Sequence, residues 1–266
     1  MRINHIRNVT LEKDGTDLDC AVFGRGDHIL ILIPGLSFQR VKNAAIPLAF
    51  MYRIFAKKYT IYVVDKKAAV PAGYTVRDMA SDVAFVMERL HLRAADVFGV
   101  SQGGMIAQYL AIDYPHLVRK LVLGVTASRK NGTMEQTINS WIRMAERREY
   151  GVLVRDMFEK MYSESYLKKY RRLLPVLTKL GKPKDFSRFI TLAKACLTCD
   201  SYPELYKITC PVFVIGGKQD RVVTGAASEE IAAALGCNIY MYDTLGHAAY
   251  EEAPDYNKRI DQFLSE

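Results

Sequence analysis

The sequence predicts an α/β protein: a mostly parallel, doubly wound sheet with an inserted helical cap. Short apolar runs that suit buried strands alternate with amphipathic stretches of helical spacing, which is the pattern of strand–helix–strand units. From residue 128 to about 202 this alternation stops and only helical periodicity remains. The chain has 266 residues, 50% of them hydrophobic and 25% charged, which suits one α/β domain that carries an insertion.

The elements expected before the insertion begin with an antiparallel hairpin, because residues 2–23 alternate around a turn at Asp14-Gly15-Thr16. The run 28–33 is apolar throughout, as expected of a strand buried on both faces of a parallel sheet. Thr75 and Asp78 have the spacing of a capping box, so Asp78 is interpreted as a helix cap and not as a catalytic acid. The other expected segments are a helix at 46–55, a strand at 60–65, a helix at 76–90, a strand at 97–100, a helix at 105–114 and a strand at 117–125.

The insertion is expected to form a helical cap over the carboxyl edge of the sheet. Apolar residues recur at helical spacing around Ile138, Leu153 and Phe189, which indicates three amphipathic helices. Methionine and aromatic side chains of these helices could line an acyl pocket, although packing against the core is the simpler interpretation.

This interpretation divides the chain into a core of residues 1–128 and 203–266 and a cap of residues 129–202. The core is completed after the cap by strands at 210–217 and 238–242 and by helices at 228–235 and about 254–264.

The most informative motif is Gly99-Val100-Ser101-Gln102-Gly103, which matches the G-x-S-x-G nucleophile elbow. It lies between an expected strand and an expected helix. Side chains at the flanking glycines would clash where the strand and the helix cross. The turn exposes the Ser101 hydroxyl above a helix N-terminus, whose amide groups favour developing negative charge.

The elbow, the strand before it and the helix after it resemble those of the α/β-hydrolase family. The Ser-x-Gly-Gly variant resembles the branch of cofactor-free esterases, lactonases, carbon–carbon bond hydrolases and haloperoxidase-like enzymes. In this family the strand that matches 28–33 ends in His-Gly, and the residue after the glycine donates its N–H to the oxyanion. Here Pro34 replaces the histidine and Gly35 is kept. The resemblance therefore implies the backbone N–H groups of Leu36 and Gln102 as oxyanion donors.

A second departure from the family follows Asp65. Family members often continue with Arg-Gly-x-Gly, whereas this chain has Lys66-Lys67-Ala68-Ala69. We expect this substitution to alter a loop near the site.

Ser101, Asp220 and His247 occur in the nucleophile–acid–base order of α/β-hydrolases. Each follows an expected strand, so all three should meet at one edge of the sheet. His247 would accept the Ser101 proton, and Asp220 would hold the imidazole and stabilise its protonated form. Asp243 is the main competitor for the acid but should lie at the end of its strand or point away. The other histidines have no glycine before them in a loop after a strand, and surface roles suffice for them.

Composition excludes several other classes of function. The net charge is +8, and residues 131–202 hold 14 Lys or Arg against 8 Asp or Glu, an excess of 6. These basic residues are spread over amphipathic helices without a nucleic-acid motif, so we expect solvated helix faces and no nucleic-acid partner. Attraction of an anionic substrate or an acidic acyl carrier stays open. We expect no metal and no cofactor, because neither metal-ligand spacing nor a dinucleotide loop occurs.

Targeting signals are not evident. No apolar run approaches the roughly 20 residues that span a bilayer, and the first residues lack a signal-peptide pattern. The 5 cysteines form no disulfide framework, and Cys196-x-x-Cys199 is interpreted as a pair of core thiols. We therefore expect a cytoplasmic protein. The oligomeric state is not indicated.

The leading hypothesis is a serine hydrolase that cleaves a small carboxylic ester through an acyl-enzyme intermediate. Acyl-thioesterase, lactonase, carbon–carbon bond hydrolase and acyltransferase activities stay open. A small-molecule receptor that has kept the fold but does not turn over is the alternative from a different class. A proline-type aminopeptidase fits less well, because its relatives carry a different pattern around the elbow.

Overall fold

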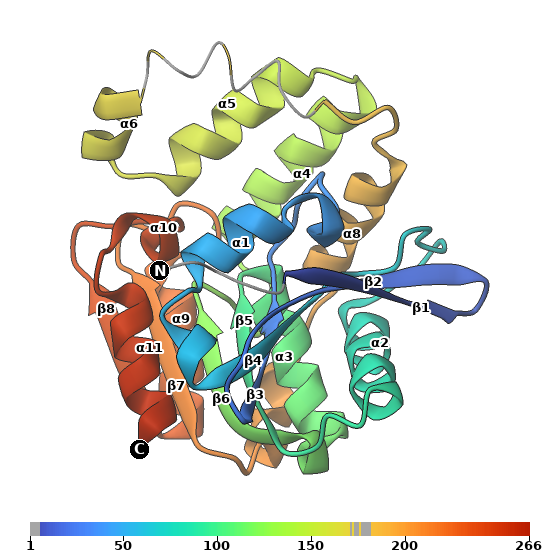
Figure 1. Ribbon diagram of the computed structural model, residues 1–266. Coiled ribbons are helices and arrows are strands. Elements are labelled where there is room, and N and C mark those ends of the chain that lie inside the picture. The colour runs from blue at the N-terminus through green and yellow to red at the C-terminus, as the bar shows by residue number, and fades with distance from the viewer. Residues whose placement is uncertain (1–5, 171, 173–175, 177–181) are drawn as a thin grey trace.

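A computed structural model describes residues 6–170, 172, 176 and 182–266. Eight strands form one sheet in the order β1-β2-β4-β3-β5-β6-β7-β8 (Figure 1). β2 is antiparallel to both of its neighbours, β1 and β4. All other neighbouring strands are parallel. The strands are β1 (Arg7–Lys13), β2 (Thr16–Gly24), β3 (His28–Ile33), β4 (Tyr59–Val64), β5 (Ala95–Val100), β6 (Val118–Gly124), β7 (Val212–Gly217) and β8 (Asn238–Tyr242). The predicted fold class is confirmed. The predicted opening hairpin is also confirmed where it is described, and residues 2–5 of its range lie outside the described residues.

The strands that follow β3 in the chain are added to the sheet first on one side of it and then on the other. β3 pairs with β4 on one side and with β5 on the other, so the chain crosses over between β4 and β5. In open parallel sheets ligands bind at such a switch point, outside the carboxyl ends of the strands. The carboxyl ends here are Ile33 of β3 and Val100 of β5.

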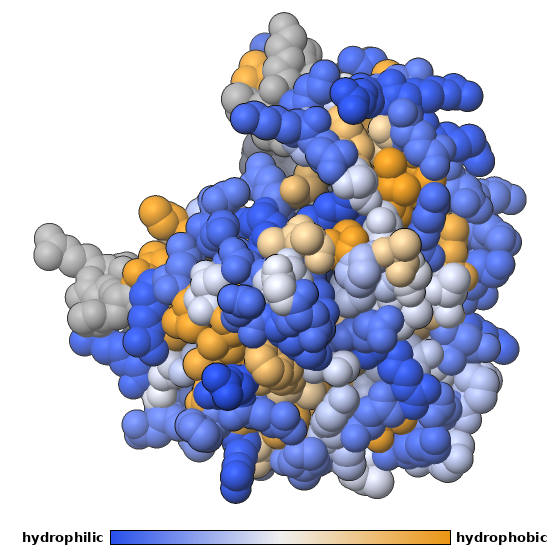
Figure 2. Space-filling model, turned by 90° about the vertical axis from the view of Figure 1, so that its right-hand side faces the viewer, coloured by the Kyte–Doolittle hydropathy of each residue, from blue (hydrophilic) through white to orange (hydrophobic). Residues whose placement is uncertain are grey.

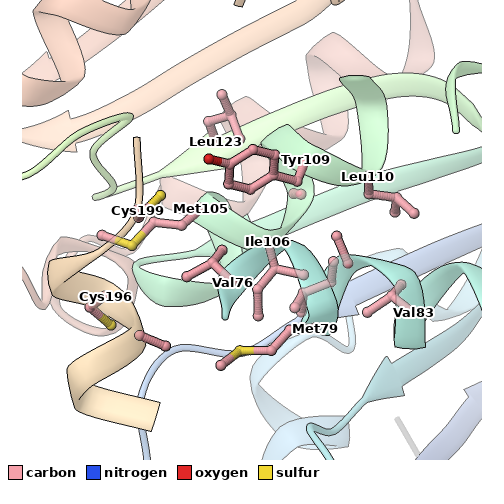
Figure 3. Packing of buried hydrophobic residues seen from close by; sticks show 14 of the residues in the cluster. Val76, Met79, Val83, Met105, Ile106, Tyr109, Leu110, Leu123, Cys196 and Cys199 are labelled. Atoms are coloured by element: carbon pink, nitrogen blue, oxygen red, sulfur yellow. The ribbon is translucent and has the colours of Figure 1, made fainter. Parts of the chain in front are cut away.

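Helices cover both faces of the sheet. α2 (Val76–Arg89), α3 (Gln102–Asp113) and α9 (Gly225–Leu235) contribute to the apolar layer on one face, and α1 (Ala45–Met51) and α11 (Tyr256–Ser265) to the layer on the other. Side chains of α2 face those of α3 in Figure 3, where Val76 and Met79 lie beside Ile106. The capping box predicted at Thr75 and Asp78 is present at the start of α2.

α3 is buried from Gln102 to Ile112, so apolar contacts hold it on all sides. This burial matters for the site, because α3 begins directly after the serine of the elbow. The helix that supports the elbow is therefore fixed by the core of the protein.

Between β6 and β7 the described residues form mainly helices, which lie above the carboxyl edge of the sheet (Figure 1). We call residues 129–202 the helical segment. Near its ends, Arg129 and Asp200 form an antiparallel bridge. Its described helices are α4 (Gly132–Glu146), α5 (Tyr150–Met161), α6 (Glu164–Tyr170) and α8 (Ser187–Leu197).

The three predicted amphipathic helices of this segment correspond to α4, α5 and α8. α6 was not predicted, because it is only seven residues long and buries none of them completely, so its periodicity gives a weak signal. A short helix α10 (Ala249–Glu252), between His247 and α11, was also not predicted. Short 3-10 turns at Val41–Asn43, Phe55–Lys57, Pro115–Leu117 and Tyr202–Lys207 complete the described elements.

Basic side chains of the helical segment point mainly to solvent. Arg143, Arg147, Arg148 and Arg155 are all exposed. Figure 2 shows a largely hydrophilic surface with separate apolar patches on the face that lies to the right in Figure 1. The predicted solvated helix faces are confirmed for Arg143 and Arg155, whereas Arg147 and Arg148 lie in the turn after α4.

Candidate active site

The serine of the motif lies on a strained turn between β5 and α3. Ser101 has a φ of 54° and a ψ of −120°, a backbone conformation that a residue with a side chain keeps only where its surroundings enforce it. Its N–H donates to Gly124 O at 2.9 Å, and its carbonyl accepts from Thr126 Oγ1 at 2.7 Å. A Cβ at Gly103 would lie 1.8 Å from Ile33 O, so only glycine lets α3 approach β3 this closely. The predicted strand–serine–helix turn is confirmed.

Three side chains from distant parts of the chain form one row of hydrogen bonds. His247 Nε2 lies 2.9 Å from Ser101 Oγ, and His247 Nδ1 lies 2.8 Å from Asp220 Oδ2. The other oxygen of Asp220 accepts the backbone N–H groups of Val222 at 2.7 Å and Val223 at 3.0 Å. An ionised carboxylate only accepts hydrogen bonds, so it places the imidazole proton on Nδ1 and leaves Nε2 to accept from the serine hydroxyl.

The loops after β7 and β8 pack tightly together, which brings Asp220 to His247. A Cβ at Gly217 would lie 2.3 Å from Leu245 O, and Gln219 N–H donates to the same carbonyl at 3.0 Å. Asp243, the competing acid, points away: its side chain is 78% exposed and pairs with Lys218 at 2.7 Å. The structure therefore brings Ser101, Asp220 and His247 together and leaves Asp243 outside.

The two backbone groups expected to bind an oxyanion flank the serine. A Cβ at Gly35 would lie 3.2 Å from Ser101 Cβ, so the turn after β3 runs beside the serine. Leu36 N–H makes no hydrogen bond within the part of the chain that the structure describes. Gln102 N–H is the first of α3, where amides lack partners inside the helix and the helix dipole is positive. Both groups can therefore donate to an anion.

Sequence reasoning missed one residue near these donors. Lys66 follows β4 by two positions and is only 5% exposed, and its ammonium donates to Gly35 O at 2.8 Å and also to Pro34 O. Burial lowers the pKa of Lys66 to about 8. The available signal was a run of charged residues at the carboxyl end of an apolar strand, the edge at which the other site residues were expected.

A narrow cavity adjoins the serine. It has a volume of about 40 Å³, enough for a few water molecules. Four of its lining residues are methionines, one from the core helix α3 and the others from α4 and α5. The lining consists of Gly35, Leu36, Ser101, Met105, Met134, Ile138, Trp141, Met157, Met161, Cys196, Val222, Val223, His247 and Tyr250. Side chains of the helical segment therefore do line this cavity, which the sequence had left open.

The helical segment is also bonded to the loop that carries the histidine. Ala248 N–H donates to Met161 O at 2.8 Å, directly after His247 in the chain. Two residues after Met161, Ser163 N–H donates to Glu252 Oε1 at 2.9 Å. The Ser163 hydroxyl also donates to this carboxylate. The end of α5 is therefore coupled to the position of the imidazole.

The cysteines of Cys196-x-x-Cys199 are buried free thiols beside α3 (Figure 3). Burial raises the pKa of each thiol to about 12, so both stay protonated near neutral pH. Cys196 Sγ lies 3.1 Å from Gln102 Nε2, which also donates to Leu192 O at 2.6 Å. α8 thus holds the side chain of Gln102, the residue directly after Ser101. The interpretation as core thiols is confirmed.

Three of the other histidines lie at the protein surface. His28, His91 and His116 are exposed, and His5 lies outside the described residues. Within residues 6–170, 172, 176 and 182–266, no group of three or more His, Cys, Asp or Glu side chains could hold a metal ion. In the same described ranges no helix combines the length and apolarity that a bilayer crossing requires.

The match to a family model decides the identity of the fold. The model of the alpha/beta hydrolase fold matches residues 64–254, which include Ser101, Asp220 and His247. The chain belongs to the α/β-hydrolase family. This family membership supports a hydrolase activity.

Relatives of known name span nearly the whole chain. 3-Oxoadipate enol-lactonase 2 of Acinetobacter baylyi is 24% identical and covers 99% of this chain and 98% of its own. The 2-hydroxy-6-oxononadienedioate/2-hydroxy-6-oxononatrienedioate hydrolase of a Pseudomonas species is 23% identical over 91% of this chain and 89% of its own.

The fold is shared with solved α/β-hydrolase structures. The enol-lactonase of Burkholderia xenovorans superimposes with a TM-score of 0.84 at 21% identity, covering 97% of this chain and 100% of its own. The esterase of Exiguobacterium antarcticum superimposes with a TM-score of 0.80 at 20% identity, covering 95% and 97%. These α/β-hydrolases differ in reaction, so the choice of substrate must be argued from the site.

Proposed function

We propose that this protein is a serine hydrolase that cleaves small carboxylic esters through an acyl-enzyme intermediate. The observation that carries the proposal is the row Asp220–His247–Ser101, with both hydrogen bonds within 2.9 Å and the serine beside unpaired backbone amides. A serine hydroxyl is a poor nucleophile at neutral pH unless a base removes its proton. The site provides that base and holds it in the required tautomer.

The proposed reaction has two halves. Ser101 Oγ attacks the ester carbonyl while His247 Nε2 takes the hydroxyl proton, and the carbonyl oxygen becomes an oxyanion that the Leu36 and Gln102 amides bind. The bond to the alcohol oxygen then breaks, and His247 returns the proton to the leaving alcohol. A water molecule, deprotonated by the same imidazole, cleaves the acyl-enzyme to release the acid.

The helical segment serves as a cap in this proposal, with residues 1–128 and 203–266 as the core and 129–202 as the cap. The methionines of α4 and α5 would contact the acyl group. Because methionine is unbranched and flexible, its side chains can move to admit an acyl chain larger than the narrow cavity. Cap residues would thus select the substrate, while core residues would perform the chemistry. A cytoplasmic location and independence of cofactors belong to the same proposal.

A lactone is the second candidate substrate. The similarity to 3-oxoadipate enol-lactonase 2 over 99% of this chain favours it. A lactone is a cyclic ester, so the same steps open the ring, and the leaving alcohol stays attached to the acyl group.

The decisive experiment measures turnover of p-nitrophenyl acetate and butyrate, with γ-butyrolactone as the cyclic substrate. The wild type should turn over repeatedly and react with a fluorophosphonate probe at Ser101. The Ser101→Ala variant should lose at least about 10⁴-fold in kcat and all labelling. Ser165→Ala, an exposed serine on α6, is the matched control and should keep full activity.

Two outcomes would contradict the proposal. A single slow acylation without turnover would favour the receptor alternative. Normal turnover by the Ser101→Ala variant would remove the nucleophile assignment.

A further inference from the structure

Lys66 has a buried ammonium that, among the described residues, donates hydrogen bonds only to one turn of the main chain. It contacts the carbonyl oxygens of Pro34 and Gly35, the latter at 2.8 Å. This turn carries β3 past the serine, and Leu36, the next residue, lines the cavity. The neighbouring ammonium of Lys67 differs: it pairs with Asp14 at 2.7 Å and lies 3.6 Å from Asp82.

No carboxylate of the described residues pairs with Lys66. The adjacent carboxylate of Asp65 is occupied by two guanidinium groups, Arg40 at 2.6 Å and Arg188 at 3.0 Å. Lys66 therefore feels the charge of Asp65 only in competition with these two guanidinium groups, and a buried charge that is not paired is costly, so stability alone does not favour it. The positive charge of Lys66 therefore remains available to a negative charge that forms during a reaction.

The geometry of the Gly35–Leu36 peptide group determines where the positive charge of Lys66 acts. Gly35 C=O and Leu36 N–H belong to the same peptide group, and this group is trans, so the two point in opposite directions. An ammonium bonded to the Gly35 oxygen lies at one end of the peptide dipole, and an oxyanion bound by Leu36 N–H lies at the other. We propose that Lys66 is a positioning residue of the oxyanion site, which orients and polarises the Gly35–Leu36 peptide so that its N–H binds the oxyanion more strongly.

This inference rests on the proposed serine-hydrolase function and adds a residue to it. A hydrogen bond to the carbonyl of a peptide strengthens the donor at its other end. The full charge of the ammonium also favours the oxyanion electrostatically, because the peptide and the surrounding core exclude water between them. Both effects act on the transition state and not on the bound ester, so they should change kcat and leave KM nearly constant.

The charge state of Lys66 makes the inference testable by pH. The pKa of Lys66 is lowered to about 8: burial is the largest cause, Asp65 and Cys196 partly oppose it, and Arg188 on α8 acts in the same direction as burial. Raising the pH through this value removes the proton and with it the positive charge. The value of kcat/KM, which reports the free enzyme, should therefore fall above pH of about 8.

The experiment compares wild type, Lys66→Met and Lys67→Met with p-nitrophenyl acetate from pH 6 to 10. Methionine has a similar length and carries no charge. Lys66→Met should lower kcat at pH 7.5 by about 30-fold, somewhat less than the loss of a direct oxyanion donor, with KM within twofold. It should also abolish the alkaline fall in kcat/KM. Lys67→Met should keep both the kcat and the alkaline fall.

A boronic acid inhibitor supplies a readout that a purely structural role would not change. Its adduct with Ser101 is a tetrahedral anion with an oxygen in the oxyanion site. Its inhibition constant should rise in Lys66→Met by about the same factor as kcat falls. Thermal unfolding of each variant, measured at the same pH, shows whether the variant is folded.

The outcomes separate the two proposals. A wild type that neither turns over nor reacts with the fluorophosphonate probe would defeat the proposed function itself. An active wild type whose Lys66→Met variant keeps kcat, boronate affinity and the alkaline fall would overturn only the role of Lys66. If Lys66→Met does not fold, the wild-type pH profile decides, and a flat kcat/KM up to pH 10 overturns the inference.

Discussion

The two walls of the cavity are built differently. The wall from the core consists of strand ends and tight turns, where backbone atoms are in close contact and the serine is held at a φ of 54°. The wall from the helical segment consists of side chains on α4, α5 and α8, of which those from α5, Met157 and Met161, are only partly buried, and α6, the next helix, buries no residue. Closely packed atoms resist displacement, so the first wall should be more rigid than the α5 part of the second. We infer that the core fixes the chemistry and that the helical segment adjusts the choice of substrate.

The largest effect that this contrast predicts is a loss of kcat on changing a residue of the core. Asp220→Asn should lower kcat by about 10⁴-fold, because an amide can hold the imidazole in the wrong tautomer while the fold is kept. Rates with p-nitrophenyl acetate provide the measurement. Asp243→Asn is the matched control, since that carboxylate is 78% exposed, and its kcat should stay within twofold. A loss in Asp243→Asn equal to that of Asp220→Asn would reverse the assignment of the acid.

Glycine substitutions at the start of two helices compare the walls directly. Gly103→Ala places a Cβ 1.8 Å from Ile33 O, a clash with backbone that should destabilise the fold by about 3 kcal/mol or more. Gly132→Ala, at the first position of α4, meets no atom within 4 Å and should stabilise by about 0.5 kcal/mol. Urea unfolding of both variants measures these changes. Equal stability of the two would mean that the elbow is less tightly packed than the structure indicates.

Methionines from the two walls should respond differently to truncation. Met105→Ala, in the buried helix α3, should cost about 2–5 kcal/mol in stability. Met157→Ala, in α5, is half-buried and should cost less than about 1 kcal/mol. The α5 variant should instead raise the hexanoate-to-acetate ratio of kcat/KM by about tenfold, because the loss of two carbon atoms and the sulfur makes room for a longer acyl chain. An unchanged ratio would argue against a role of α5 in selecting the acyl group.

The smallest expected effect concerns the bonds that join the walls. Glu252→Gln removes the charge that accepts from Ser163, and it should raise KM about two- to threefold, since one charge-assisted hydrogen bond near the surface is weakened. Hydrogen exchange of α5 and α6 should become faster in this variant. Glu164→Gln, an exposed residue at the start of α6, provides the control. Unchanged exchange in α5 would show that this contact does not hold the helical segment.

Much of the core and of the candidate site could be predicted from the sequence, because the relevant signals are local. Glycines around Ser101 indicate a turn with no room for side chains, and apolar runs indicate strands buried on both faces. Parallel strands place their carboxyl ends at one edge, so residues that follow them meet there even when 146 positions separate them, as for Ser101 and His247. This reasoning placed Asp220 beside His247 without coordinates.

The sequence by itself thus determined the fold class, the strained turn at the serine, and the residues that follow the strands. The tertiary structure alone decided that Lys66 turns inward to the Gly35 carbonyl while Lys67 pairs with acids, since adjacent lysines carry the same local signal. It also decided which methionines reach the cavity and that α6 forms without a fully buried residue. Periodicity reports which side of an element is buried, but the partner across that side depends on contacts between distant parts of the chain.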